Sequence, residues 1–284
     1  MGASYWSNDY YRDREAERVK SGVDAFAYSK ATAAKPVHEQ KVNDLLNPKG
    51  VTRESRDSDN HPESLAIAVI CDETGSMRTT PMTMRDNLPS LMGLMVGKGV
   101  KDPQILFGAV GDASYREAAP LQIGQFESGT EMADDLGRIF MEGKGGGSNQ
   151  ESYQNVLYFF ARHASCDCFE KRGRKGYLFI MGDEHPYDFV YRAQVEALMG
   201  DTLQDDIPTA EIVRECAQKW EIYFVIPRGT DNYGDMSLLE KWRGLLGHDH
   251  VIMLNDAAGI CGIIADVVAG AKVEADPKSK TVRL

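Results

Sequence analysis

From Leu65 onward, short apolar runs alternate with longer segments in which apolar residues recur at helical spacing. Short apolar runs are typical of buried strands, and a period of three to four residues is typical of helices. The pattern predicts strands at 65–71, 104–110, 121–126, 177–181, 222–226 and 250–254, and helices at 88–97, 131–141, 151–163, 209–220, 238–246 and 257–271. Strands that alternate with helices indicate a three-layer, Rossmann-like α/β fold, with a mostly parallel central sheet and helices on both faces.

The first 63 residues differ from this pattern. They begin with an aromatic cluster and continue with an apolar stripe at helical spacing, made of Tyr5, Trp6, Tyr10, Tyr11, Val19, Val23 and Phe26. After Ala34 the segment is polar and interrupted by proline and glycine. We therefore predict an N-terminal arm over 1–63, with one helix and an extended strap, an α/β domain over 64–272 and a C-terminal tail over 273–284.

The arm has no core of its own for these apolar side chains to enter. An arm that exposed them would be an aggregation hazard, because soluble monomers limit their apolar patches. The arm therefore packs either on the α/β domain or on another subunit or partner. The sequence leaves both outcomes open, and self-association through the arm is one of them.

Composition restricts the class of protein. Hydrophobic residues make up 42% and charged residues 26% of the 284 residues, which is an ordinary globular balance. The net charge of −11 argues against nucleic acid as the main partner, because phosphate binding needs a basic surface. Residues 1–63 carry eleven acidic and ten basic side chains, so the acidity belongs to the rest of the chain.

Targeting signals and cysteine usage indicate a cytoplasmic protein without a membrane partner. No apolar run approaches the roughly 20 residues of a membrane span, and the N-terminus leads into charged residues instead of an apolar signal core. The five cysteines are odd in number, and Cys71, Cys216 and Cys261 lie in apolar or helical runs, which predicts reduced, buried thiols. Cys166 and Cys168 lack the second Cys or His pair of a zinc site.

The candidate chemistry lies in loops that follow strands, because ligands of parallel α/β sheets bind beyond the carboxyl ends of the strands. The loop after the first strand carries an alternating set of oxygens, so a turn can direct all of them to one point. A glycine-rich loop that ends in a hydroxyl and the end of a later strand add to this set. Together the three loops offer two carboxylates and three hydroxyls: Asp72, Thr74, Ser76, Ser148 and Asp183.

These oxygens predict a metal site. Hard oxygen donors with few charges suit Mg²⁺ or Mn²⁺, with water at the remaining positions. Each loop alone has a simpler explanation as a helix N-cap or a turn, but their joint occurrence at one edge of the predicted sheet favours a metal. Four neighbours would form the rim or the outer shell of the site: Glu73, Asn149, Glu184 and His185.

The run Asp-x-Thr-Gly-Ser-Met at 72–77, the later Gly-Gly-Ser and the strand-end Asp resemble the metal-ion-dependent adhesion site (MIDAS) of von Willebrand factor A (vWA) domains. The resemblance covers about residues 64–272, including the order of strands and helices. Intracellular bacterial and phage members of that family commonly carry Asp-x-Thr-Gly-Ser. The resemblance implies a vWA fold and a Mg²⁺-binding site that recognises protein partners.

Carried over residue by residue, the resemblance implies that Thr74 and Ser76 bind the ion directly, with Asp72 and Asp183 near it or acting through water. Ser148 stands where the family usually has Thr and keeps the hydroxyl. In that family, a carboxylate from a protein partner takes the open position of the ion. Physical reasoning agrees, because a cation held mainly by neutral hydroxyls keeps residual positive charge and an exchangeable water.

An enzyme is the alternative. Asp72 on the first strand, with Asp183 and Asp188 later, also resembles haloacid-dehalogenase-type phosphatases, which use Asp-x-Asp with the second Asp as general acid. Thr74 occupies that position here and cannot donate a proton usefully near neutral pH. A phosphate-binding Gly-x4-Gly-Lys-Ser/Thr run is absent from the sequence. The sequence therefore predicts a non-enzymatic, metal-dependent protein-binding module, with a metal-dependent phosphatase as the alternative.

Overall fold

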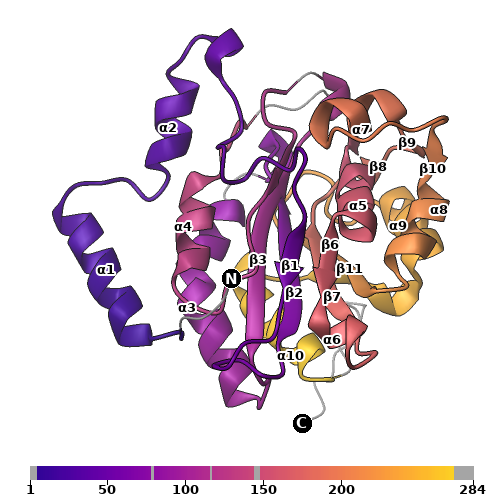
Figure 1. The fold of residues 1–284 in the computed structure, drawn as a ribbon. Coiled ribbons are helices and arrows are strands. Elements are labelled where there is room, and N and C mark those ends of the chain that lie inside the picture. The colour runs from indigo at the N-terminus through magenta and orange to yellow at the C-terminus, as the bar shows by residue number, and fades with distance from the viewer. Residues whose placement is uncertain (1–4, 78–79, 116, 144–147, 272–284) are drawn as a thin grey trace.

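A six-stranded sheet forms the centre of the computed structural model, which describes residues 5–77, 80–115, 117–143 and 148–271 (Figure 1). In sheet order, the strands are β12 (Val251–Leu254), β11 (Trp220–Pro227), β7 (Gly176–Met181), β2 (Leu65–Asp72), β3 (Pro103–Val110) and β4 (Leu121–Ile123). Every pairing in this sheet is parallel except that of β4 with β3. All residues of β2 and β3 are buried, which explains why these strands read as unbroken apolar runs.

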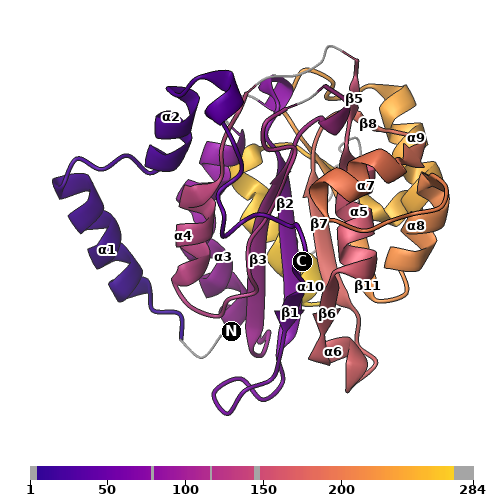
Figure 2. The ribbon, with the colours of Figure 1, turned by 45° about the horizontal axis from the view of Figure 1, so that its top comes forward.

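Helices cover both faces of the sheet (Figures 1 and 2). One face carries α3 (Thr80–Gly97), α4 (Glu131–Arg138) and α10 (Ile260–Val268), and the other carries α5 (Tyr153–Arg162), α8 (Thr209–Cys216) and α9 (Met236–Leu246). α3 packs against α10, and α5 packs against α8. The three-layer α/β fold predicted from the sequence is therefore confirmed.

Short elements that carry no readable period complete the chain. They are β1 (Arg53–Ser55) with β6 (Ala164–Cys166), β5 (Gln150–Glu151) with β8 (His185–Pro186), β9 (Phe189–Val190) with β10 (Ile207–Pro208), helices α6 (Asp167–Glu170) and α7 (Arg192–Leu198), and 3₁₀ turns at Val37–Glu39, Gly75–Met77, Ala113–Tyr115, His248–His250 and Ala257–Gly259. The predicted helix at 151–163 begins only at Tyr153, because Gln150 and Glu151 pair with β8 instead.

The cysteines and the helices can be compared with the predictions of buried thiols and of no membrane-spanning segment. All five cysteines lie in the described ranges, are buried and form no disulfide. Across the parts of the chain that the structure describes, none of the helices combines the length and the apolar character that crossing a membrane requires.

The arm contains two helices, α1 (Asn8–Lys20) and α2 (Ala27–Ala33), so the prediction of one helix was wrong. The chain turns at Gly22, which adopts a φ of +67° that only glycine takes readily. Val19 and Val23 consequently lie on either side of this turn, and they are 66% and 50% exposed. Their helical spacing in the sequence therefore does not form a buried stripe.

The arm packs on its own α/β domain, beside α4 (Figure 2). The Tyr11 side chain is buried, and the Arg14 guanidinium binds the Asp134 carboxylate at 2.5 Å. In α2, the Ser29 hydroxyl accepts a hydrogen bond from the backbone N–H of Met141 at 2.9 Å. The first of the two outcomes left open by the sequence is therefore seen, whereas self-association stays a prediction.

Deleting residues 1–34 should leave a folded α/β domain with a lower melting temperature, because the arm covers α4 but supplies no strand to the central sheet. Thermal melting and light scattering of the truncated and full chains would measure the two effects. Arg14→Ala should lower the melting temperature more than Arg12→Ala, since Arg12 is exposed. An unfolded truncated chain would contradict the prediction, and a lower mass after truncation would reveal self-association through the arm.

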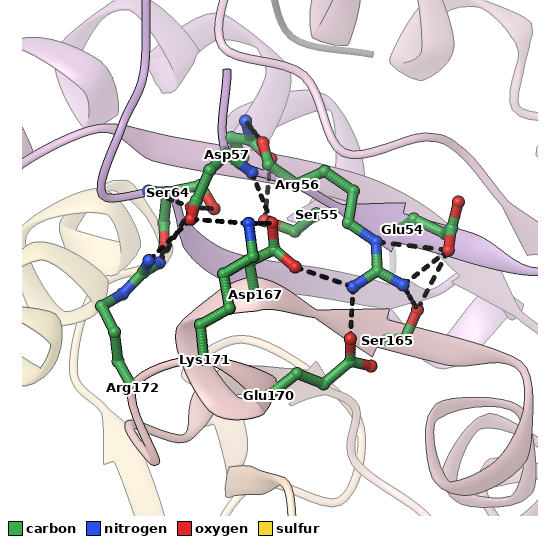
Figure 3. A network of polar contacts seen from close by, with 11 residues as sticks. Glu54, Ser55, Arg56, Asp57, Ser64, Ser165, Asp167, Glu170, Lys171 and Arg172 are labelled. Atoms are coloured by element: carbon green, nitrogen blue, oxygen red, sulfur yellow. Dashed lines mark hydrogen bonds and ion pairs between the residues drawn. The ribbon is translucent and has the colours of Figure 1, made fainter. Parts of the chain in front are cut away.

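The strap, which is the extended part of the arm, forms charge pairs between residues at and just after β1 and residues at and just after α6 (Figure 3). Arg56 contacts three carboxylates, those of Glu54 at 2.7 Å, Asp167 at 2.9 Å and Glu170. Asp57 accepts hydrogen bonds from the Arg172 guanidinium at 2.8 and 3.0 Å. The contacts with Asp167, Glu170 and Arg172 join segments more than 100 residues apart and hold the strap against α6 and the residues that follow it.

The Asp57 contacts should make stability depend on pH. Hydrogen bonds from Arg172 hold the pKa of Asp57 well below its usual range, so the pairing stabilises the fold above the unfolded pKa of about 4. This stabilisation is lost as the pH falls through the lower, folded pKa.

We expect Asp57→Asn to lower the free energy of unfolding by about 1–2 kcal/mol at pH 7, and the difference from the native chain to shrink below pH 4. Urea unfolding at several pH values would measure it. Asp59→Asn, at an exposed neighbour, should change nothing. A difference that stays constant from pH 7 to pH 3 would contradict the assignment.

Candidate metal site

The candidate site lies where the strand order reverses. From β2 the chain proceeds to β3 on one side, and it later reaches β7 and β11 on the other. The loops that leave β2 and β7 therefore diverge, and ligands of parallel α/β sheets bind at such a point. Asp72 ends β2, and Asp183 follows β7 closely; both are fully buried. Because Cys71 pairs with Met181 in the sheet, these two carboxylates leave it side by side.

Three donors fix the Asp72 carboxylate. Its Oδ1 accepts hydrogen bonds from the Thr74 backbone N–H at 2.8 Å and from the Thr74 hydroxyl at 2.5 Å. Its Oδ2 accepts a hydrogen bond from the Tyr153 hydroxyl at 2.5 Å. A hydroxyl that gives its hydrogen to Asp72 directs its lone pairs elsewhere, and lone pairs are what a cation binds. The turn is therefore suited to present the Thr74 oxygen to an ion, with Asp72 behind it.

The buried charge of Asp72 creates an electrostatic demand for positive charge. Burial raises the pKa of Asp72 above its usual value, hydrogen bonds from Thr74 and Tyr153 lower it, and the nearby Asp183 charge raises it again. Asp183 also accepts a hydrogen bond from the Asn232 backbone N–H at 3.0 Å. A buried charge is tolerated when it is paired or binds a metal. A cation between the two loops would meet that demand.

Tyr153 belongs to the site, although sequence analysis did not find it. Its ring packs edge-on against Phe224 and Trp242, with centroid distances of 5.3 and 5.5 Å. Its hydroxyl lies so close to Gly182 that a Cβ there would be 2.1 Å away. Gly182 therefore makes room for the hydroxyl that holds Asp72. No sequence signal indicated this role, because Tyr153 stands within an apolar helical run.

Ser148, the predicted ligand from the glycine-rich loop, is exposed, unlike the buried Asp72 and Asp183. Its hydroxyl exchanges hydrogen bonds of 3.2 and 3.3 Å with the backbone of Gln150. Asn149 is also exposed, with a φ of +55°, and its carbonyl accepts from the His185 N–H at 3.1 Å. This contact joins the loop to the segment after β7. The backbone of Ser76 lies in the turn after Thr74, and its side chain is outside the described part.

The predicted rim residues divide into two groups. Glu184 and His185 lie beside Asp183, and the His185 ring contacts the Ser237 hydroxyl at 3.3 Å. Glu73 instead points away into the protein, where it is 2% exposed and accepts a hydrogen bond from the Gln122 amide at 3.0 Å. Burial raises the pKa of Glu73 well above its usual value, and the charge of Glu117 adds to the increase.

Two further buried acids at this edge were missed. Asp112 follows β3, is fully buried and accepts a hydrogen bond from the Tyr187 hydroxyl at 2.9 Å. It has the same strand-end position as Asp183, which was the available signal. Glu151 is also fully buried, and the prediction of a helix from residue 151 concealed it. Burial raises the pKa of Glu151 strongly, and the charges of Asp72 and Glu184 raise it further.

The described acids at this edge have few basic neighbours and do not form a complete set of metal ligands. No lysine or arginine within the described ranges forms an ion pair with Asp72, Asp112 or Glu151. Within the same ranges, no three His, Cys, Asp or Glu side chains gather in an arrangement that would hold an ion by themselves. An ion here would therefore need hydroxyl or water oxygens as well as carboxylates, which is the donor set that Mg²⁺ and Mn²⁺ accept.

Comparisons with known proteins give likeness of structure alone. No protein-family model and no curated protein matches the sequence. Solved structures with a similar backbone include proximal thread matrix protein 1 of the mussel byssus, at 9% identity and a TM-score of 0.48, over 72% of this chain and 48% of that one. The match covers about half of the mussel protein.

Two bacterial structures are similar to the same degree. One is the pilus adhesin SpaC from Lactobacillus rhamnosus GG in its open conformation, at 12% identity and a TM-score of 0.49, over 78% of this chain and 31% of that one. The other is the vWF domain of the type V pili tip protein Mfa5 from Porphyromonas gingivalis, at 9% identity and a TM-score of 0.46, over 72% of this chain and 94% of that one. The match to SpaC spans about a third of that protein.

Removing the Tyr153 hydroxyl should destabilise the fold through Asp72. We expect Tyr153→Phe to lower the free energy of unfolding by about 1–3 kcal/mol, because a fully buried carboxylate loses a donor. The matched control is Tyr158→Phe in the same helix, whose hydroxyl binds the partly exposed Asp201 at 2.7 Å. Urea unfolding of both variants would compare them. An equal decrease in the free energy of unfolding in both variants would show that the Tyr153–Asp72 hydrogen bond stabilises the fold no more than the Tyr158–Asp201 hydrogen bond does.

Proposed function

We propose that this chain is a metal-dependent protein-binding module, which holds Mg²⁺ or Mn²⁺ at the carboxyl ends of β2 and β7 and engages an acidic residue of a protein partner. The observation that supports it most is the buried turn in which the Thr74 hydroxyl donates to Asp72 while Asp183 lies alongside. This turn stands where the strand order reverses, and its sequence is the part that resembles a vWA metal site.

In this proposal, each residue has a distinct role. Thr74 and Ser76 supply neutral oxygens to the ion, and Asp72 and Asp183 hold it from behind, through water. Tyr153 and the Thr74 N–H keep Asp72 in place. When bound, the ion would supply positive charge at the carboxyl ends of β2 and β7.

The partner is expected to be a protein that offers an Asp or Glu side chain. A carboxylate can replace a water on a divalent ion and form a strong charge-assisted contact. The acidity of the chain opposes the approach of an acidic partner, but salt screens that repulsion beyond about 8–10 Å. The repulsion therefore affects the rate of encounter more than the contact itself. We place this activity in the cytoplasm, on the composition of the chain.

A binding role is preferred to catalysis because of Thr74. A phosphatase of the type considered above needs a general acid at this position, whereas the Thr74 hydroxyl donates its hydrogen to Asp72. The hydrogen bond therefore favours a structural and ligand-binding role for the hydroxyl.

Calorimetric titration with Mg²⁺ and Mn²⁺ tests the site, and capture of partners from lysate with and without EDTA tests the role. We expect the native chain to bind either ion weakly, and the double variant Thr74→Ala, Ser76→Ala to bind at least about tenfold more weakly. Thr202→Ala, at an exposed threonine, is the control. Equal binding by the double variant and the native chain would remove the site, and capture that is insensitive to EDTA and to Asp72→Ala would remove the role.

A further inference from the structure

Glu151 is the least satisfied acidic side chain near the proposed site. It is 0% exposed, and within the described ranges no backbone N–H, amide, hydroxyl or basic side chain donates a hydrogen bond to its carboxyl oxygens. A buried carboxylate without donors or a counter-charge is strongly disfavoured. The fold nevertheless places it in a paired strand, so its position is determined by the backbone. Such a group is expected to have a binding partner in the functional state.

The surroundings of Glu151 indicate the charge of that binding partner. The pairing of β5 with β8 sets Glu151 opposite Pro186, directly after the segment that carries Asp183 and Glu184. The Glu184 carboxyl is in contact with that of Glu151, and Asp72 is another close charge. Two carboxyl groups in contact repel each other when both are ionised, so either a shared proton or a cation must lie between them. A divalent cation is the ligand with the right charge and with a preference for oxygen.

Ser148, by contrast, is poorly placed for the role that the sequence assigns to it. It is exposed, whereas Glu151 is fully buried on the same loop. Its hydroxyl is engaged within its own turn by the backbone of Gln150. Of the two residues, it is Glu151, in β5, whose carboxyl lies close to the charges of Asp72 and Glu184.

We infer that Glu151, together with Glu184, is a ligand of the divalent cation at the proposed site, in place of Ser148. This inference rests on the proposed metal site and assigns the contribution of its second loop. The ligand set would then combine the Thr74 and Ser76 hydroxyls with two carboxylates. A higher ligand charge is one of the means by which oxygen sites increase their affinity for divalent cations.

The test is Mn²⁺ titration of the full-length chain by calorimetry. Glu151→Gln should weaken Mn²⁺ binding by about tenfold or more, because the amide keeps the shape and removes the charge. Ser148→Ala and Glu196→Gln should stay within about twofold of the native chain. Glu196 is the matched control, since it is an exposed glutamate on α7.

Thermal melting provides a second reading that does not depend on calorimetry. In EDTA, Glu151→Gln should melt at or above the temperature of the native chain, because it removes an unpaired buried carboxylate. Added Mn²⁺ should raise the melting temperature of the native chain by mass action, but not that of the variant. If Glu151→Gln does not fold, the half-buried Glu184→Gln takes its place, with the same expected loss of Mn²⁺ binding.

The outcomes separate this inference from the proposed function. Native Mn²⁺ affinity in both Glu151→Gln and Glu184→Gln, or its loss in Ser148→Ala, would overturn the ligand assignment while leaving the binding module intact. Loss of Mn²⁺ in Glu151→Gln together with partner capture that ignores EDTA would support the assignment and overturn the protein-binding role. A native chain that binds no Mn²⁺ at all would overturn both.

Discussion

The structure depends on a negative charge, that of Asp72, which is buried where the strand order of the sheet reverses. Asp72 ends β2, a strand whose residues are all buried, and is itself shielded from water. Its carboxylate is stable there because Thr74 and Tyr153 donate hydrogen bonds to it. Those donors impose further constraints. The Tyr153 ring needs the aromatic wall of Phe224 and Trp242, and its hydroxyl needs a residue without Cβ at position 182. One carboxylate thus accounts for side chains on β11, α5 and α9 and for the glycine directly after β7.

The central sheet and its covering helices were predictable because the burial that forms them leaves a regular pattern of apolar residues in the sequence. Long strands that are covered on both faces must be apolar throughout, and helices on a sheet must repeat every three to four residues, so the sequence displays both. The arm and the short strand pairs lack such a signal. Val19 and Val23 have the spacing of a helix face, but the turn at Gly22 separates them. Two-residue strands such as Gln150–Glu151 are set by their partners, which local sequence does not reveal.

The candidate site was predictable to the extent that its residues follow strands. Asp72 and Asp183 could be placed at one edge because parallel strands end together, and the structure brings them side by side. Tyr153 and Glu151 could not, because their roles come from tertiary contacts. An apolar helical context made Tyr153 resemble a core residue, and an apparent helix start made Glu151 resemble a solvated one. Burial, which decides both, is a property of the assembled layers.

The number of carboxylates at the ion determines what the module can recognise. An ion held by Thr74 and Ser76 alone keeps most of its charge and attracts an acidic partner strongly. Adding Glu151 and Glu184 would neutralise that charge, bind the ion more tightly and leave less attraction for another carboxylate. Partner binding would then have to displace a water or one of these two glutamates. A higher affinity for the metal would therefore mean a lower affinity for the partner. Removing the Glu151 charge should weaken binding of the metal, and at saturating metal it should strengthen binding of the partner.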